Sequence, residues 1–412
     1  MTTSASSTSV WRAPGMPALL ALTAAGFTGY SALLPVAPLW AVSGGANEAG
    51  AGFVNGMLML ATILTQPFVP TLLRRFGYGR VLAAGLLFLN GPALLHLVSH
   101  DLVWILGLSA VRGLGFGILT VTGSAAVANL VAPARHGAAI GAYGASVAVP
   151  QLLLLPAGPW LAEAIGFWVV FALATVPLLA IGAAPRLAHA LREEKAERSP
   201  AQHADPSTST AATRDEGRVR YLASALIPPM VILLGVTLAG GALITFTPQM
   251  SSSAAATTAG LTLLTATAAL SRWRLGALAD RYGAGRFLWP LILCTVLGLA
   301  LAAAAVTDSA STRVTLLLLG MTFVGVAYGG LQNLTLLLSL SAVRRKDYNT
   351  ASAVWNIGFD SGTGLGSVLV GSLAAGLSFP IALLAAAGAS LATLPVALLR
   401  RRRTTSAHTP GV

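Results

Sequence analysis

The chain has 412 residues, of which 55% are hydrophobic and only 9% are charged, and its mean hydropathy is +0.76. A soluble domain carries about one-quarter charged residues, so this composition excludes a water-soluble globular protein and predicts one surrounded by lipid. The net charge of +12 would suggest a nucleic-acid partner in a soluble protein. Here most basic residues lie in short segments between apolar runs, which excludes that interpretation.

Twelve apolar runs follow one another along the chain, each long enough, at about twenty residues, for a helix to cross a bilayer. We therefore expect an all-α membrane protein with twelve transmembrane helices. The runs cover residues 17–40, 51–72, 80–99, 104–128, 138–160, 167–184, 221–246, 255–276, 286–306, 314–339, 350–374 and 380–400.

The longest polar stretch, residues 186–220, divides these runs six and six. Its centre is rich in Ser, Thr, Pro and Ala and cannot bury a core, so we expect a flexible cytoplasmic linker. Its first part, 186–198, is predicted to form a short basic amphipathic helix on the inner membrane surface. The predicted parts are a cytoplasmic tail, 1–16, a six-helix bundle, 17–185, the linker, a second six-helix bundle, 221–400, and a cytoplasmic tail, 401–412.

The basic residues predict the orientation in the membrane. With the N-terminus inside, 21 of the 25 Lys and Arg fall on the cytoplasmic side, and only Arg313 falls in an outside loop. This asymmetry predicts a multi-pass protein of the cytoplasmic membrane with both termini in the cytoplasm. The polar first residues lead directly into a full-length span, which favours a retained helix over a signal peptide. The single cysteine, Cys294, lies in an apolar run, so we expect no disulfide, no metal site and no cofactor.

Two loops 206 residues apart contain the same sequence motif. Residues 70–82 read PTLLRRFGYGRVL, and residues 276–288 read GALADRYGAGRFL. Each copy lies between two apolar runs at the same place in its half, which predicts a protein built from two similar halves, as many secondary transporters are. Six of the thirteen aligned positions are identical: Leu72/Leu278, Arg75/Arg281, Gly77/Gly283, Gly79/Gly285, Arg80/Arg286 and Leu82/Leu288.

The second copy resembles the G-x-L-A-D-R-x-G-x-x-R loop signature of the major facilitator superfamily. The first copy departs from it, with Pro70 in place of the glycine and Arg74 in place of the aspartate. The resemblance covers essentially the whole chain and implies two pseudo-symmetric six-helix bundles around a central cavity that opens alternately to each side. The residues that fit the signature in the second copy are Gly276, Leu278, Ala279, Asp280, Arg281, Gly283 and Arg286.

Further motifs resemble those of drug:proton antiporters within this family. Arg112 is followed by Gly113, Gly115 and Gly117, as in the family's buried-arginine motif, and Pro35 and Pro38 resemble the proline pair that ends the first span. Pro150 and Pro156 lie in the fifth span, but their spacing departs from the antiporter motif there. We expect these prolines to mark helix bends.

Asp360 is the leading candidate for proton coupling. It lies in an otherwise uncharged run, where a charge costs at least about 2.5–3.5 kcal/mol, so it should face a cavity or a partner. Burial and re-exposure of a carboxyl group change its proton affinity, which would couple protons to a conformational change. The alternative is a carboxylate that only ties helices together. Arg112 is the second candidate, acting on a nearby acid or on an anionic substrate, unless it simply binds backbone carbonyls at a helix bend.

Amides, an indole and one further cation are candidates for the substrate cavity. Asn356 lies one helical turn before Asp360, and the others lie within spans 5, 8, 10 and 11. Interhelical hydrogen bonding is the alternative for each of them. The candidates are Asn356, Trp355, Asn333, Gln332, Gln151 and Arg272.

The repeated loops predict a latch between the halves. By resemblance, Asp280 meets the start of the fifth span, where the helix dipole favours negative charge. Arg74 would be repelled by the start of the eleventh span, so we expect it to pair with Asp347 just before that span, unless it is only one more cytoplasmic charge.

These features predict a secondary active transporter of a small organic molecule, with protons as coupling ion and export as the favoured direction. Uptake of a metabolite is the nearest alternative, and a non-transporting sensor or scaffold is an alternative of another class. An intramembrane enzyme would need clustered acids, histidines or metal ligands, and the spans hold none. A single chain of twelve helices encloses its own pathway, so we expect a monomer.

Overall fold

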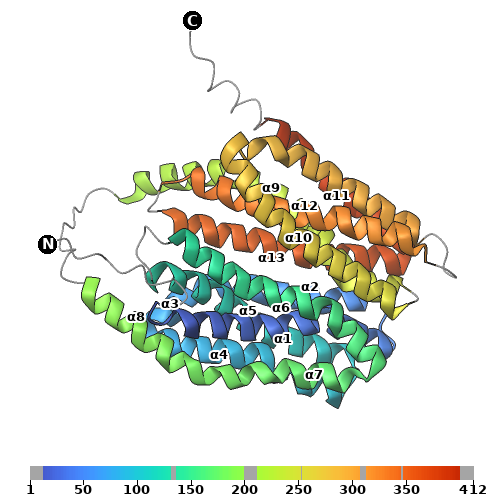
Figure 1. Cartoon of the computed structure of the whole chain (residues 1–412), viewed down its shortest axis with the longest axis horizontal. Coiled ribbons are helices and arrows are strands. Elements are labelled where there is room, and N and C mark those ends of the chain that lie inside the picture. The colour runs from blue at the N-terminus through green and yellow to red at the C-terminus, as the bar shows by residue number, and fades with distance from the viewer. Residues whose placement is uncertain are drawn as a thin grey trace, which may run out of the picture.

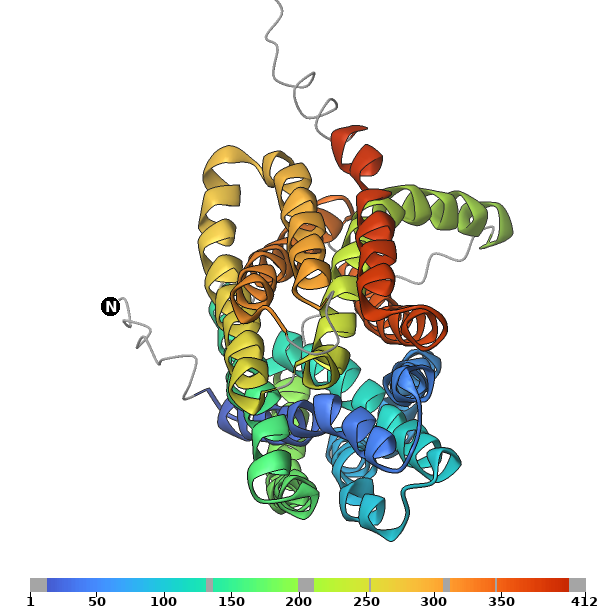
Figure 2. The ribbon, with the colours of Figure 1, turned by 90° about the vertical axis from the view of Figure 1, so that its right-hand side faces the viewer.

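The structure is a computed structural model that describes residues 13–130, 136–198, 211–251, 253–306, 312–344 and 347–399. All regular elements in these ranges are helices, and they form two bundles that lie side by side, the first half of the chain in one and the second half in the other (Figure 1; Figure 2). The predicted all-α membrane fold of two bundles is therefore confirmed.

The first bundle contains six spans, three of which continue through a short 3₁₀ segment. They are α1 (Met16–Ser43), α2 (Glu48–Thr65) continued by η2 (Gln66–Phe68) and α3 (Val69–Phe76), α4 (Tyr78–Asn90) continued by η3 (Gly91–Val98), α5 (Leu102–Leu130), α6 (His136–Ala164), and α7 (Phe167–Thr175) continued by η5 (Val176–Ala183) and α8 (Ala184–Arg198).

The second bundle repeats this arrangement, with its first five spans each formed by a single helix and its last span interrupted by a turn at residues 392–393. They are α9 (Ala211–Met250), α10 (Ala254–Tyr282), α11 (Gly285–Ala305), α12 (Val314–Ser341), α13 (Tyr348–Gly376) and α14 (Phe379–Leu391).

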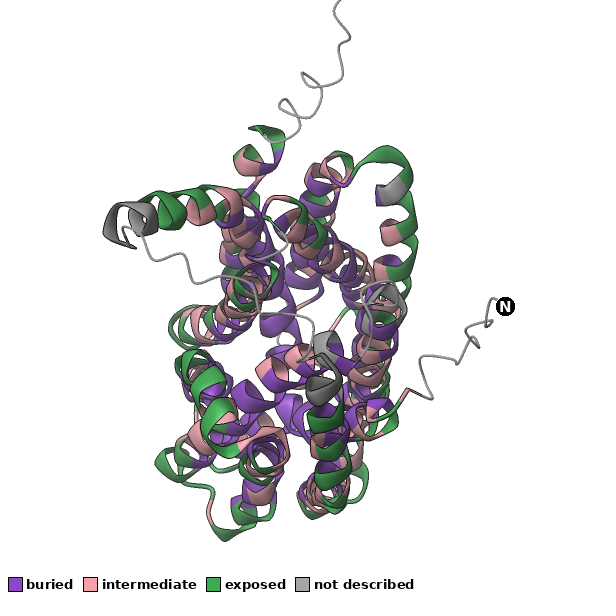
Figure 3. Cartoon of the chain, turned by 90° about the vertical axis from the view of Figure 1, so that its left-hand side faces the viewer, coloured by how far each residue is buried: buried purple, intermediate pink, exposed green. Residues whose placement is uncertain are grey.

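Eleven spans of the described chain are long and apolar enough to cross a membrane by length and composition. The twelfth span is α13, which is 29 residues long but carries Asn356, Asp360 and many Ser, Thr and Gly residues. It packs along both α2 and α9, so it crosses the same layer as they do while neighbouring helices shield its polar groups. Viewed from the end that carries the repeated loops, exposed residues lie on the outward faces of the helices and buried ones lie inside (Figure 3).

The two bundles touch along α2 and α13, most closely at the end far from the repeated loops. A Cβ atom added at Gly52 would lie 2.3 Å from the carbonyl oxygen of Ser367, and one added at Gly371 would lie 2.5 Å from the carbonyl oxygen of Glu48. Only glycine permits such an approach of two backbones, as is typical of close helix pairs in membranes. We call this region the far-end seal.

A buried chain of hydrogen bonds crosses the far-end seal. The Nδ2 atom of Asn55 in α2 donates to the hydroxyl of Thr245 in α9 over 2.9 Å and to the carbonyl oxygen of Leu34 in α1 over 2.9 Å. The Thr245 hydroxyl lies 2.8 Å from that of Ser367 in α13. All three polar side chains are buried. The seal thus joins four helices of both bundles through uncharged groups.

The predicted linker is shorter than its polar composition suggests. Helix α8 continues the sixth span to Arg198, and α9 already begins at Ala211, so only residues 199–210, which lie outside the described residues, separate them. The helix predicted over 186–198 is present and amphipathic, but its buried Leu187 and Leu191 pack on its own bundle. The polar residues therefore lengthen two helices beyond the apolar runs.

The predicted bends at prolines do not interrupt the helices. Pro35 and Pro38 lie inside the continuous helix α1, and Pro150 and Pro156 lie inside α6. Neighbouring helices therefore accommodate the backbone groups that these prolines leave unpaired.

The backbone contact at Gly52 predicts a loss of stability on substitution. Gly52→Ala should lower the free energy of unfolding by about 1–3 kcal/mol, because the added methyl group overlaps a backbone oxygen that cannot rotate away. The apparent melting temperature of the purified protein in detergent measures this. Gly107→Ala in α5 is the control, since a Cβ there meets no atom within 4 Å. Equal melting of both variants would contradict the contact.

Candidate functional site

Asp360 lies where α13 meets the first bundle, and the residue is 3% exposed. Its Oδ2 atom accepts a hydrogen bond of 2.7 Å from Nε2 of Gln66, which stands at the first position of η2, where the second span changes its helical pitch. The sequence analysis placed Asp360 inside the membrane but did not single out Gln66. This hydrogen bond crosses from one bundle to the other.

Tyrosines from two helices lie within electrostatic range of this carboxylate, and each contacts a phenylalanine of a further helix. Tyr30 of α1 and Tyr328 of α12 both lie close enough to Asp360 to interact with it electrostatically. Tyr30 is stacked on Phe116 of α5, with ring centroids 4.0 Å apart, and Tyr328 lies 6.2 Å from Phe359 of α13. The site is therefore a buried carboxylate among rings, with two phenol hydroxyls nearby.

Arg112 lies in the interior of the first bundle and is fully buried on α5. None of its three guanidinium nitrogens has a hydrogen-bond partner among the described residues. Tyr30 lies within electrostatic range of both Arg112 and Asp360. A buried cation without a partner is unfavourable by several kcal/mol, so this position attracts negative charge. The two predicted proton-coupling residues are thus not paired, but Tyr30 interacts with both.

The first bundle contains further buried polar groups without a partner among the described residues, and one of them, His96, lies within electrostatic range of Arg112. Several acceptors without a partner lie in helices of the same bundle, all of them on fully buried residues. The sequence analysis did not identify this group, because single Ser, Asn and His residues in apolar runs carry no pattern. The atoms are the hydroxyls of Ser31 and Ser109, Oδ1 of Asn90 and Nε2 of His96.

Three of the predicted cavity residues form one hydrogen-bonded group between α10 and α12. The guanidinium of Arg272 donates to Oε1 of Gln332, and Nδ2 of Asn333 donates to the carbonyl oxygen of Arg272 over 3.1 Å. Trp355 of α13 adjoins this group by donating from Nε1 to the hydroxyl of Thr335 over 3.1 Å. The second bundle therefore presents a cation, two amides and an indole close together.

Two predicted cavity residues do not join this group. The amide of Asn356 donates to the carbonyl oxygen of Ser352 in its own helix over 3.0 Å, and not to Asp360. Gln151 in α6 is partly buried and makes no side-chain hydrogen bond within the described chain. The helical spacing places Asn356 on the same face of the helix as Asp360, but it did not predict which group Asn356 hydrogen-bonds to.

The repeat in the loops extends into this site. Gln66 and Arg272 are 206 positions apart, the same separation as the two loop copies, and each lies in the second span of its half. Gln66 donates to Asp360, whereas Arg272 donates to Gln332. The position thus holds a hydrogen-bond donor in both halves, but only Gln66 reaches the other bundle. The separation of 206 was the sequence signal that would have found it.

The loop copies also match in conformation. Gly77 has a φ of 77° and Gly283 a φ of 84°, a region that disfavours every residue with a Cβ atom. Gly276 lies close to a different group, since a Cβ there would lie 2.9 Å from the end of the Asn333 side chain. In each copy an arginine lies over the ring that follows it, Arg75 over Phe76 and Arg281 over Tyr282.

The predicted Arg74–Asp347 pair is not formed. Oδ1 of the buried Asp347 accepts a hydrogen bond of 2.7 Å from Nη2 of Arg218, and Arg74 donates to Thr71 of its own helix. Arg218 was not predicted as the partner because its polar segment was assigned to the linker, whereas the residue belongs to α9. The predicted contact of Asp280 with the start of the fifth span lies outside the described residues, because neither the Asp280 side chain nor residues 131–135 are described.

Comparison with known proteins agrees with this architecture. The family model described as Major Facilitator Superfamily matches residues 19–343 and 230–412. No curated protein matches the chain in sequence.

Solved transporters share the fold. A bacterial homolog of the human lysosomal transporter Spinster, inward-facing and unoccupied, superposes with a TM-score of 0.69 at 14% identity, over 97% of this chain and 98% of that one. The nucleoside transporter NupG superposes with a TM-score of 0.69 at 13% identity, over 93% of this chain and 98% of that one.

The Gln66–Asp360 hydrogen bond predicts how single and double substitutions at these two residues change the stability of the protein. Gln66→Leu should destabilise the protein by about 1–3 kcal/mol, because it leaves a buried carboxylate without its donor. Adding Asp360→Leu should restore most of the melting temperature, since no buried polar group is then left unpaired. Gln151→Leu is the control, as this amide makes no hydrogen bond to a described residue. If the double variant melts as low as Gln66→Leu alone, the bond does not stabilise the bundle contact.

Proposed function

The chain belongs to the major facilitator superfamily, and from that premise we propose that it moves a small organic molecule across the cytoplasmic membrane by proton-coupled alternating access. Membership of this family makes the chain a membrane transporter and not an enzyme. The proposal concerns the coupling ion, the direction of transport and the orientation of the chain in the membrane.

The hydrogen bond between Gln66 and Asp360 carries the proposal. An ionised carboxylate accepts a charge-assisted bond, which is about twice as strong as a neutral one. Protonation of Asp360 therefore weakens a contact that joins the two bundles. A proton that reaches Asp360 thus changes the relative free energy of arrangements in which α2 and α13 are together or apart.

The aromatic rings and hydrogen-bond donors near Asp360 favour a substrate that has an aromatic or otherwise apolar part and some polar atoms. Trp355 and Phe359 are stacked with ring centroids 5.8 Å apart, and Tyr328 adjoins Phe359. Arg272 and Gln332 supply donors beside these rings, and the Nε2 atom of Gln332 and the Nε atom of Arg272 have no partner among the described residues. Such a surface binds rings by stacking and orients them through a few hydrogen bonds.

The proposed orientation places both termini and the basic repeated loops in the cytoplasm. The far-end seal then closes the outer side of the molecule. We favour export because the prolines at the end of the first span resemble those of drug:proton antiporters. A proton-coupled importer would use the same carboxylate, with protons and substrate moving in the same direction instead of in opposite directions, and a monomer suffices for either.

Proton release on ligand addition tests the proposal. Purified protein in weakly buffered detergent is titrated with a panel of small organic compounds, and the pH and binding are recorded together. The wild type should release protons when a compound binds, and Asp360→Asn should bind without release. Glu163→Gln is the control, because Glu163 is an exposed acid at the far end of α6. Binding with equal proton release by Asp360→Asn and the wild type would overturn the role of Asp360.

A further inference from the structure

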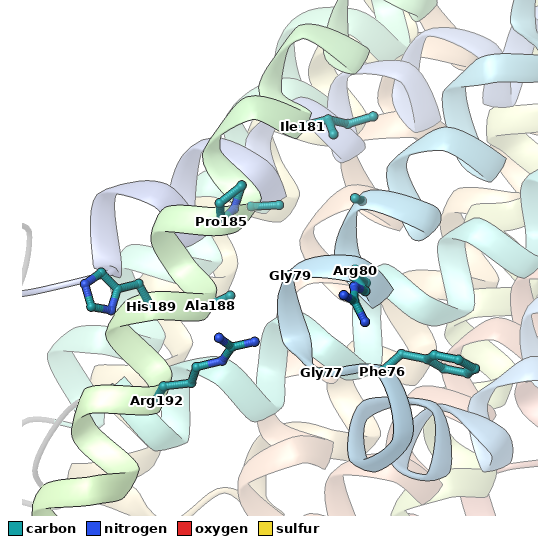
Figure 4. A pocket seen from close by; sticks show the side chains of 11 residues that line it. Phe76, Gly77, Gly79, Arg80, Ile181, Pro185, Ala188, His189 and Arg192 are labelled. Carbon is teal, nitrogen blue, oxygen red and sulfur yellow. The ribbon is translucent and has the colours of Figure 1, made fainter.

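The N-terminal end of α4 and helix α8 enclose a pocket of about 380 Å³ at the end of the molecule that carries the repeated loops (Figure 4). It lies outside the contact between the bundles and shares no residue with the site around Asp360. Helix α8 approaches α4 closely beside it, since a Cβ added at Gly79 would lie 2.9 Å from Cβ of Ala188.

Two arginines from different helices face this pocket. Figure 4 shows the Arg192 side chain of α8 reaching across towards Arg80 of α4. Both side chains are exposed, and neither forms a hydrogen bond or ion pair with a described residue. His189 also lines the pocket, and its Nε2 atom lies 3.6 Å from the exposed carboxylate of Glu193. Two unpaired cations that face each other repel, so an anion between them is favoured.

The other walls of the pocket are apolar. Phe76, Ala83 and Ile181 line it. In the segment that carries Ile181, Leu179 is 83% exposed, as expected for a side chain of a membrane span that faces lipid. The pocket therefore combines a cationic mouth with an apolar wall that leads to the lipid-facing surface.

We propose that this pocket binds an anionic phospholipid of the cytoplasmic leaflet, with the phosphate between Arg80 and Arg192 and an acyl chain along η5. A planar guanidinium matches phosphate oxygens well, and basic pockets between helices at this membrane face suit such headgroups. The apolar wall favours a lipid over a free phosphate. A bound lipid would tie α8, which leads into the linker, to the loop that carries the first copy of the repeat.

The second half lacks this pair of cations. The corresponding pocket is lined by Arg286, which matches Arg80 in the repeat, together with four residues that carry no charge. Of these two pockets, the one in the first half presents arginines from two sides, and the one in the second half presents a single arginine.

Native mass spectrometry of the delipidated full chain tests this site, with phosphatidylglycerol, phosphatidylcholine and glycerol phosphate as probes. Arg80→Gln with Arg192→Gln should weaken phosphatidylglycerol binding about 25-fold, at about fivefold for each arginine. Binding of phosphatidylcholine should not change. Arg80→Lys with Arg192→Lys should retain most of the affinity, because the charge remains.

Arg74→Gln with Arg75→Gln is the matched control. It removes the same charge from the same loop region, but neither residue lines the pocket. The control should weaken binding less than about threefold. Equal weakening by both double variants would overturn the proposal in favour of general surface attraction, and glycerol phosphate binding as tightly as the lipid would replace it with a free-phosphate site. If the double glutamine variant does not fold, the single variants carry the same test.

Discussion

Inside a bilayer no water compensates a buried charge, so a partner within the protein stabilises a charged side chain in a membrane helix. In this chain the partner of Asp360 is Gln66, which belongs to the opposite bundle. The charge on the Asp360 carboxylate therefore affects how closely the two bundles are held together. Any motion that separates α2 from α13 at this depth removes the hydrogen bond, and any loss of the charge weakens it.

The two ends of the bundle contact are built differently. At the far end, glycines bring the backbones of α2 and α13 together, and the Asn55, Thr245 and Ser367 side chains join them through neutral hydrogen bonds. Nearer the repeated loops, the contact depends on a charged group. Packing thus makes the seal independent of protons, whereas the Gln66–Asp360 bond responds to them. Arg112 adds a fixed positive charge inside the first bundle, within electrostatic range of Tyr30.

The hydropathy pattern was sufficient to predict the twelve spans and the division into two bundles, because lipid imposes the same length and apolarity on every span. It also placed Asp360 and Arg112 in the interior, since charges are rare there. Side-chain partners were harder to predict, because they depend on how helices from different halves meet. Asn356 binds its own helix, and Asp347 binds Arg218 and not Arg74. Gln66 was missed, although the repeat aligns it with Arg272.

Protonation of Asp360 is expected to change the distance between the two bundles at the end that carries the repeated loops. Spin labels at Phe76 and Tyr282, exposed positions at the end of each bundle that carries the repeated loops, report this separation in a Cys294→Ser background by pulsed electron paramagnetic resonance. Between about pH 8 and pH 5, a range that spans the usual titration of perturbed carboxyl groups, the distance distribution should shift to longer distances. With Asp360→Asn it should not respond to pH. The same pH-dependent shift in that variant would contradict the account.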